Sequence, residues 1–225
     1  MTTRTTVTII GAGQAGLAMS RCLTEKSIDH VVLERGEVAN SWRTERWDSL
    51  RLLTPNWMTR LPEFRYEGSD PDGYMTGTEV QQFLETYRHS FNAPIQTETS
   101  VKHIHTQNGE RGHIVTTNQG QFHSDAVVIA TGACSTPRIP ALSAELPSHI
   151  AQLAPIHYRN PAQIADGRVL VVGASASGAQ IADELQRAGR DVTLTWAGGA
   201  LAPGDEEYRT LVERAVIGRG LRDAV

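Results

Sequence analysis

The stretch Val7-Thr8-Ile9-Ile10-Gly11-Ala12-Gly13-Gln14-Ala15-Gly16 places an apolar run directly before a glycine-rich turn. The run Val7–Ile10 is rich in β-branched residues and predicts a buried strand, and Leu17–Met19 begins a helix that we expect to end near Lys26. A turn between such a strand and such a helix aims backbone N–H groups and the positive end of the helix dipole at one point. This arrangement predicts a binding site for the pyrophosphate of a dinucleotide.

The three glycines of this turn have the spacing of a dinucleotide-binding fingerprint. Gly11 permits the tight turn, Gly13 lets the phosphates approach the main chain, and Gly16 lets the helix pack closely on the strand. Gln14 and Ala15 lie between these glycines, so we expect all five residues to bind the cofactor. Glycines also serve ordinary turns, so the spacing by itself leaves that alternative open.

An acidic residue follows the second apolar strand, Val31–Leu33. Glu34 stands at the carboxyl end of this strand, where a carboxylate accepts hydrogen bonds from ribose hydroxyls. The alternative is a solvated strand end without a ligand. With the glycine turn in register, Glu34 is predicted to bind ribose.

A second glycine-rich turn, Gly173-Ala174-Ser175-Ala176-Ser177-Gly178, follows the apolar run Val169–Val172 and opens a helix of small residues. Ser175 stands where the middle glycine would be, and its hydroxyl, like that of Ser177, can hydrogen-bond phosphate. A βα turn without a ligand is the alternative. Together the two turns predict two dinucleotide sites in one chain, the second built on Gly173, Ser175, Ser177 and Gly178.

The sequence leaves the nucleotide preference of the second turn undecided. After the next strand, Asp191–Thr195, an NAD site would carry an acidic residue and an NADP site a nearby basic one. The chain continues instead with Trp196-Ala197-Gly198-Gly199, which is neither acidic nor basic.

The composition is that of an ordinary soluble protein with a sizeable core, since 40% of its 225 residues are hydrophobic and 20% are charged. The net charge of −4 and the scattered Lys and Arg residues give no support for nucleic-acid binding. No apolar run approaches the roughly 20 residues of a membrane helix, and the polar start has no signal-peptide core. We therefore expect no nucleic-acid or membrane partner and a cytoplasmic location.

Cysteines and histidines restrict the chemistry further. Cys22 and Cys134 are the only cysteines and cannot form the CxxC pair of a thiol-disulfide flavoenzyme. His103 and His105 alternate along a predicted strand without a cysteine or carboxylate at ligand spacing, so we expect no metal site.

Three of the four tryptophans, Trp42, Trp47 and Trp57, lie in an irregular stretch between the two turns. Arginines are interleaved with them, and flat rings beside cations suit a flavin ring and its phosphates. A small aromatic cluster under a long loop is the alternative for any one tryptophan. Trp42 and Arg43 are the candidate cofactor contacts in this stretch.

Three short strands are predicted around Val101–Thr106, Gly112–Thr117 and Gln121–His123. The turns Gln107-Asn108-Gly109 and Asn118-Gln119-Gly120 separate them, and this punctuation between alternating runs is typical of hairpins. The pattern predicts a three-stranded antiparallel meander.

The chain then returns to a buried strand at Ala126–Ile129, which leads into Ala130, Thr131 and Gly132. Small residues at this strand end let the backbone lie against a cofactor, so these three are candidate cofactor contacts.

The predicted fold class is α/β. A parallel sheet with strands near Val7–Gly11, Asp29–Leu33 and Asp125–Ala130 carries helices on its faces and the meander on one side. A further helix is predicted at Thr78–His89, and an incomplete βαβ unit at Arg168–Thr195 ends the pattern.

This order of elements resembles that of flavoproteins with two dinucleotide-binding domains. Several short motifs are similar to those of the class B flavin-dependent monooxygenases, and in particular to the bacterial enzymes related to flavin-containing and Baeyer–Villiger monooxygenases. The resemblance covers residues 5 to about 195. Its motifs are Trp42-Arg43, Trp47-Asp48-Ser49-Leu50-Arg51-Leu52, Thr54-Pro55-Asn56, Leu61-Pro62, Ala130-Thr131-Gly132, Tyr158-Arg159-Asn160-Pro161 and Val171-Val172-Gly173-Ala174-Ser175-Ala176-Ser177-Gly178.

The resemblance implies a Rossmann-like FAD-binding domain at residues 1–150, with a parallel sheet and the antiparallel meander, and a partial Rossmann-like NAD(P)-binding domain at 151–225. It implies that the first turn binds FAD and the second binds NADPH. Arg35 and the backbone of Val101 match positions beside the FAD adenosine in such proteins.

The implied activity is that of an FAD-dependent, NADPH-utilising monooxygenase, which uses O2 to oxygenate a small nucleophilic or carbonyl substrate through a hydroperoxyflavin. Thr54 and Asn56 are the candidate catalytic residues, expected to hydrogen-bond the oxygenated flavin; simple turn residues are the alternative. Two other function classes stay open: a truncated nucleotide-binding module without turnover, and an NAD(P)H-dependent flavin reductase or oxidase.

Family members generally continue well past the second turn, so we expect this chain to be truncated at its C-terminal side, or to be the N-terminal part of such an enzyme. The last residues show weak helical character at Glu206–Val216. We expect the edge at Val192–Thr195 to be unpaired, which would favour a homo-oligomer that covers it.

Overall fold

The computed structural model describes residues 2–106, 112–196 and 199–201. The predicted turn Gln107-Asn108-Gly109, the pair Ala197-Gly198 and the predicted helix at Glu206–Val216 lie outside the described residues. The described residues form two compact units. The first comprises residues 2–44, 60–65 and 78–136, and the second comprises residues 45–59, 66–77 and those described from 137 onward. The division into domains at 1–150 and 151–225 stays a prediction.

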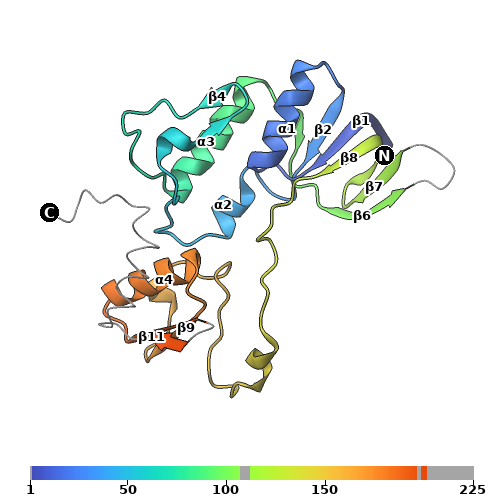
Figure 1. Ribbon diagram of the computed structural model, residues 1–225. Coiled ribbons are helices and arrows are strands. Elements are labelled where there is room, and N and C mark those ends of the chain that lie inside the picture. Colours follow the sequence, from blue (N-terminus) through green and yellow to red (C-terminus); the bar gives the residue numbers. More distant parts are fainter. Residues whose placement is uncertain (1, 107–111, 197–198, 202–225) are drawn as a thin grey trace. The chain divides into compact units, whose positions relative to one another are not determined.

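The first unit is built on a six-stranded mixed sheet in the order β5-β2-β1-β8-β7-β6 (Figure 1). Neighbouring strands from β5 to β8 run parallel, and β8, β7 and β6 are antiparallel neighbours. This confirms the α/β class and places Val7–Ile10 and Ala126–Ile129 in one sheet, as predicted. The strands are β1 (Thr2–Ile10), β2 (His30–Leu33), β5 (Ile95–Gln96), β6 (Val101–Thr106), β7 (His113–Thr117) and β8 (Gly120–Ile129).

Helix α1 (Gln14–Glu25) covers one face of this sheet, where Ile9 and Leu17 are completely buried. Helix α3 (Gly77–Ser90), close to the bounds predicted for it, buries Val80, Leu84 and Tyr87. None of the helices in the described parts of the chain is long and apolar enough to cross a membrane.

The hairpin of β3 (Arg60–Leu61) and β4 (Phe64–Arg65) packs against α3. The ring of Phe64 lies 5.0 Å from that of Phe83 and 5.2 Å from that of Tyr87, between centroids. The Tyr87 hydroxyl donates a 3.0 Å hydrogen bond to the carbonyl oxygen of Pro62. This contact makes α3 and the hairpin one packed element.

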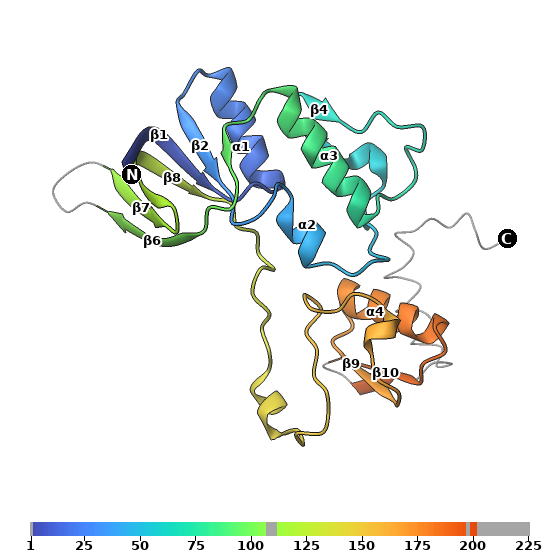
Figure 2. The same cartoon turned by 180° about the vertical axis from the view of Figure 1, so that it is seen from behind.

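The antiparallel end of the sheet coils toward the parallel strands. Leu33 of β2, Val115 of β7 and Phe122 of β8 form one buried cluster, although β1 lies between β2 and β8 in the sheet. Figure 2 shows β6, β7 and β8 side by side at this end. The predicted meander therefore forms part of the main sheet rather than a separate layer beside it.

The strand predicted at Gln121–His123 and the strand predicted near Asp125–Ala130 are one strand, β8, which differs from the expectation. No glycine or proline interrupts the sequence between Phe122 and Ile129, so the chain has no signal to turn. The first half of β8 pairs with β7, and almost its whole length pairs with β1.

The second unit contains the predicted βαβ element: β9 (Val169–Val172), α4 (Ala176–Arg187) and β10 (Val192–Trp196), with β9 and β10 parallel. The expected unpaired edge at Val192–Thr195 is wrong, because β11 (Gly199–Leu201) pairs antiparallel with residues 194–196 of β10. An antiparallel partner needs only a very short connection, and a parallel one would need a crossover. Short 3-10 turns complete the unit at Asn56–Met58, Ala141–Glu145 and Pro161–Gln163.

Candidate functional site

The first glycine turn has the geometry that its sequence predicts. Gly11 has a φ of +107°, which other residues rarely adopt, and its N–H donates to the Leu33 carbonyl over 2.8 Å. A Cβ added at Gly11 would lie 2.5 Å from the Ala130 carbonyl oxygen, and one added at Gly16 would collide with the carbonyl oxygen of Gly11. Both glycines are therefore required by close backbone packing.

Gly13 differs from the other two glycines, because no atom of the described residues, apart from its own chain neighbours, lies within 4 Å of a Cβ placed there. Gly13 is the N-cap of α1 and makes no side-chain cap hydrogen bond. The first turn of this helix contains no acidic residue. The N–H groups of Gln14 and Ala15 at the helix start thus lie beside open space, at the positive end of the helix dipole. An anionic group fits this position.

Glu34 is buried at the carboxyl end of β2, and its carboxylate is tied to the turn. Oε2 accepts a 2.7 Å hydrogen bond from the Ala12 N–H, and Oε1 accepts a 3.2 Å bond from the Gly36 N–H. Each oxygen retains a further lone pair, so the group can still accept from a ligand hydroxyl. The neighbouring Arg35 is exposed.

Two other chain segments reach the same edge of the sheet. Thr99 donates its N–H to the Glu34 carbonyl over 2.7 Å, which brings the start of β6 at Val101 beside Glu34. After β8, Ala130 donates to the Ile10 carbonyl over 2.9 Å, and the exposed Thr131 and Gly132 follow. The residues of the first unit gathered at this edge are Gly11, Gly13, Gln14, Ala15, Gly16, Glu34, Arg35, Val101, Ala130, Thr131 and Gly132.

Trp42 and Arg43 lie on the short helix α2 (Asn40–Thr44) of the same unit. The chain before α2 is fixed to the glycine turn, because Ala39 donates its N–H to the Ala12 carbonyl over 3.1 Å. Gln81 on α3 donates to the Trp42 carbonyl over 3.0 Å. Helix α2 is therefore attached both to the turn and to α3.

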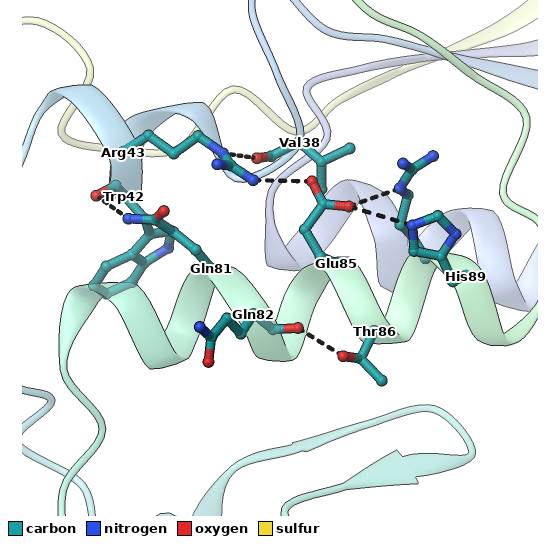
Figure 3. A network of polar contacts seen from close by, with 9 residues as sticks. Val38, Trp42, Arg43, Gln81, Gln82, Glu85, Thr86 and His89 are labelled. Atoms are coloured by element: carbon teal, nitrogen blue, oxygen red, sulfur yellow. Dashed lines mark hydrogen bonds and ion pairs between the residues drawn. The ribbon is translucent and has the colours of Figure 1, made fainter.

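The Arg43 guanidinium already has two protein partners (Figure 3). Its Nε donates to the Val38 carbonyl over 2.9 Å, and one terminal nitrogen donates to Glu85 Oε1 over 3.0 Å. The second oxygen of Glu85 accepts from Arg88 over 2.8 Å and lies 3.7 Å from His89 Nε2. Through these contacts Arg43 holds α2 against α3. A contact between Arg43 and a flavin phosphate stays a prediction. Glu85 was not predicted from the sequence, because a glutamate on an amphipathic helix carries no signal of its own.

The two candidate catalytic residues belong to the second unit. Asn56 is buried; its side-chain nitrogen donates to the Asp70 carbonyl over 2.9 Å, and its backbone N–H donates to the Gly73 carbonyl over 2.8 Å. Its Oδ1 is buried without a hydrogen-bond partner among the described residues, so it can accept from a ligand. Thr54 is exposed.

Trp47 and Trp57 also lie in the second unit and differ in environment. Trp47 is buried, and its indole N–H has no acceptor within the described ranges, whereas Trp57 is 51% exposed. The tryptophan-rich stretch is thus divided between the two units, with Trp42 in the first.

The segment around Tyr158 fastens Asp48 and α4 within the second unit. The Asp48 N–H donates to the Arg159 carbonyl over 2.8 Å, and Asn160 Nδ2 donates to Asp48 Oδ2 over 2.7 Å. The Tyr158 hydroxyl donates to Glu184 Oε2 on α4 over 2.8 Å. Burial and this bond to a carboxylate raise the pKa of Tyr158 well above its ordinary value. Tyr158 therefore stays a neutral hydrogen-bond donor.

The second glycine turn repeats the first. Gly173 has a φ of +106° and donates its N–H to the Thr195 carbonyl over 2.8 Å. A Cβ at Gly178 would collide with the Gly173 carbonyl oxygen. Ser175 is the N-cap of α4 without a side-chain cap bond, and Ser175 and Ser177 are both exposed. Their hydroxyls are therefore available to a phosphate.

Across the part of the chain that the structure describes, no three His, Cys, Asp or Glu side chains gather closely enough to hold a metal ion. Cys22 and Cys134 are both free thiols.

Residues 8–218 match the family profile described as pyridine nucleotide-disulphide oxidoreductase. Among curated proteins, the chain is 41% identical over 190 residues to an uncharacterized oxidoreductase named CzcO-like from Geobacillus kaustophilus, covering 84% of this chain and 53% of that protein. It is 30% identical over 204 residues to the indole-3-pyruvate monooxygenase YUCCA6 of Arabidopsis thaliana, covering 83% of this chain and 46% of that protein.

Among solved structures, the flavin-containing monooxygenase from Stenotrophomonas maltophilia matches with a TM-score of 0.72 and 26% identity. The match covers 85% of this chain and 57% of that one. The chain thus spans about half the length of the curated relatives it matches.

Proposed function

Because this chain belongs to the pyridine nucleotide-disulphide oxidoreductase family, we propose that it is a flavin-dependent monooxygenase that takes FAD at the first glycine turn and NADPH at the second. The observation that carries the proposal is the repetition of one backbone arrangement. Each turn begins with a glycine at positive φ, donates to the end of the next strand and opens an uncapped helix. One chain therefore offers two anion-binding helix starts of the kind that dinucleotides need.

The residues of the first turn fit FAD. The open space beside Gly13 admits a pyrophosphate, to which Gln14 and Ala15 would donate their backbone N–H groups. The Glu34 carboxylate would accept from a ribose hydroxyl while it keeps its bond to Ala12. Ala130, Thr131 and Gly132 would border the cofactor with backbone and small side chains.

Asn56 and Thr54, both in the second unit, are the proposed catalytic residues. When bound, FAD and NADPH would supply hydride transfer and the activation of O2. Asn56 would accept a hydrogen bond at its unpartnered Oδ1, and its two bonds to the 70–73 segment would fix the direction of that oxygen. Thr54 would offer its exposed hydroxyl nearby in the same loop.

The chemistry of the cysteines favours oxygenation over disulphide reduction. The family includes disulphide oxidoreductases by its description, but Cys22 and Cys134 lie far apart in the sequence and are free. A dithiol flavoenzyme needs two neighbouring thiols to exchange with its substrate. The curated and structural matches named as monooxygenases support the same choice, and the name of the Arabidopsis relative suggests a small organic substrate.

The test is to load the 225-residue protein with FAD, mix it with NADPH and measure O2 consumption with and without a panel of small ketones, α-keto acids and thioethers. A monooxygenase incorporates oxygen into one of these compounds, detected by mass spectrometry with labelled O2. Consumption of O2 with hydrogen peroxide as the sole product on every compound would indicate an oxidase or flavin reductase. Bound FAD that NADPH and NADH both leave oxidised would indicate a nucleotide-binding module.

A further inference from the structure

The two glycine turns can be aligned residue by residue, which gives each position of the first an equivalent in the second. Gly11 and Gly173 have φ values of +107° and +106°, and they donate to Leu33 and Thr195 over the same 2.8 Å. The helix N-caps also agree, with φ of −88° at Gly13 and −81° at Ser175. Because Leu33 corresponds to Thr195, the next residues correspond too, and Trp196 holds the position of Glu34.

This position has a defined chemical role in the first turn. The Glu34 carboxylate reaches back to the turn and accepts from the Ala12 N–H over 2.7 Å, which places an acidic acceptor beside the start of α1. In the second turn the equivalent donor is the N–H of Ala174. No side chain in the described ranges accepts a hydrogen bond from it. Tryptophan at position 196 has no acceptor atom to offer, because its indole is a donor only.

Charged side chains are also missing from the sequence around this strand end. After Asp191, the next charged residue of the sequence is Asp205. The charges that flank β9 and β10 lie before these strands, at the opposite edge of the parallel pair: Arg168 pairs with Asp191 over 3.2 Å, and Arg190 donates to the Ile164 carbonyl over 3.2 Å. Position 196, which corresponds to the residue that contacts the ribose in a dinucleotide-binding fold, therefore carries neither an acidic nor a basic side chain.

We propose that the second turn takes NADH and NADPH with similar affinity, and that position 196 is where a preference would be set. The inference rests on the proposed function, because it assumes that a nicotinamide dinucleotide binds at this turn. An acid at this position would accept from the free 2′-hydroxyl of NADH and repel the 2′-phosphate of NADPH, and a base would do the reverse. With an uncharged residue at position 196, NADH loses the carboxylate contact, and that position neither repels the 2′-phosphate of NADPH nor offers it a cation.

The test measures binding rather than turnover. The dissociation constants of NAD⁺ and NADP⁺ are determined by titration calorimetry on the full chain loaded with FAD. For the wild-type protein we expect the two constants to agree within about tenfold, because the charge-assisted hydrogen bond that discriminates elsewhere is worth about 1.5–3 kcal/mol, or roughly ten- to hundredfold. Trp196→Glu should shift the ratio toward NAD⁺ by about tenfold or more, and Trp196→Arg should shift it toward NADP⁺ by a similar factor.

Trp196→Leu is the control, since it removes the ring without adding a charge or a hydrogen-bonding group, and it should leave the ratio unchanged. Thermal unfolding identifies a variant that fails to fold, and either charged variant suffices for the test. A wild-type preference of about a hundredfold or more, or a ratio that neither charge moves, would overturn this inference and leave the proposed function standing. If the wild-type chain binds neither nucleotide, this inference and the proposed role of the second turn both fall.

Discussion

Replacing Gly13 with leucine should remove FAD binding without weakening the fold. The backbone at this residue has a φ of −88° and a ψ of −170°, which leucine adopts without strain. A Cβ there meets no atom of the described residues within 4 Å, apart from its own chain neighbours. The equivalent position of the second turn already carries a side chain, that of Ser175, with nearly the same dihedral angles. The new side chain would occupy the space at the start of α1 that the pyrophosphate needs.

The size of the effect follows from the hydrogen bonds that the phosphate would no longer receive. Two charge-assisted hydrogen bonds from backbone N–H groups to phosphate are worth about 1.5–3 kcal/mol each. Losing both costs at least about 3 kcal/mol, which raises the dissociation constant by at least about a hundredfold. The midpoint of thermal unfolding without FAD should stay close to that of the wild type, because substitutions that touch nothing usually change stability by no more than about 0.5 kcal/mol.

The assay is a fluorescence titration of FAD against the purified variants, with thermal unfolding recorded in parallel. Gly13→Ser is an intermediate variant and should weaken binding less than leucine, because the second turn accepts serine at this position. Gly16→Ala is the contrasting variant, since its Cβ would collide with the Gly11 carbonyl oxygen and should cost about 1–3 kcal/mol of stability. Normal FAD affinity in a folded Gly13→Leu protein would refute the assignment of the first turn.

Three further predictions concern contacts around the first turn. Glu34→Ala should weaken FAD binding by about 1–3 kcal/mol and also lower thermal stability, because it leaves the buried Ala12 N–H without its acceptor. Glu34→Gln should lower the stability less, because its amide oxygen can keep the Ala12 bond and only the longer bond from Gly36 is lost; equal unfolding midpoints for both variants would count against this. Glu85→Gln should loosen α2 and raise the FAD dissociation constant a few-fold, and it should have no further effect in a protein that already carries Arg43→Met. If the two substitutions instead weaken FAD binding additively in this double-mutant cycle, Arg43 and Glu85 do not act together. Burial raises the pKa of Tyr87 from 10.0 to about 12, so the contribution of its neutral form to stability is complete below pH 10 and is lost as the pH rises toward 12. The unfolding free energy of Tyr87→Phe should therefore fall less steeply with pH between 10 and 12, and a slope equal to that of the wild type would argue against the burial.

Much of the first unit could be predicted from sequence because its signals are local and strong. The β-branched run at Val7–Ile10, the glycine turn and the amphipathic helix at Thr78–His89 each define an element within a few residues of its observed bounds. Strand β5 was missed because Ile95–Gln96 is too short to show alternation. Its pairing depends on the Val32 and Glu34 N–H groups, which find acceptors in Pro94 and Gln96 only after the chain has folded.

For the candidate sites, the sequence predicted the backbone positions better than the side-chain contacts. Backbone positions such as Gly11 and Gly173 follow from residue type and spacing, because only glycine suits a φ near +107° beside another main chain. Side-chain partners do not follow in this way. The distance in sequence between Arg43 and Glu85 hides the ion pair that occupies the arginine, and nothing in the pattern shows that Asn56 would direct its nitrogen to Asp70 and leave its oxygen unpartnered.

One chain should hold two different dinucleotides, one at each glycine turn. Equilibrium dialysis of the purified protein against saturating FAD, followed by NADP⁺, tests it most directly by counting the nucleotides bound to each chain. We expect one FAD and one NADP⁺ per chain, bound together without competition. Gly13→Leu should remove only the FAD. Displacement of FAD by NADP⁺, or a single nucleotide per chain under all conditions, would contradict it.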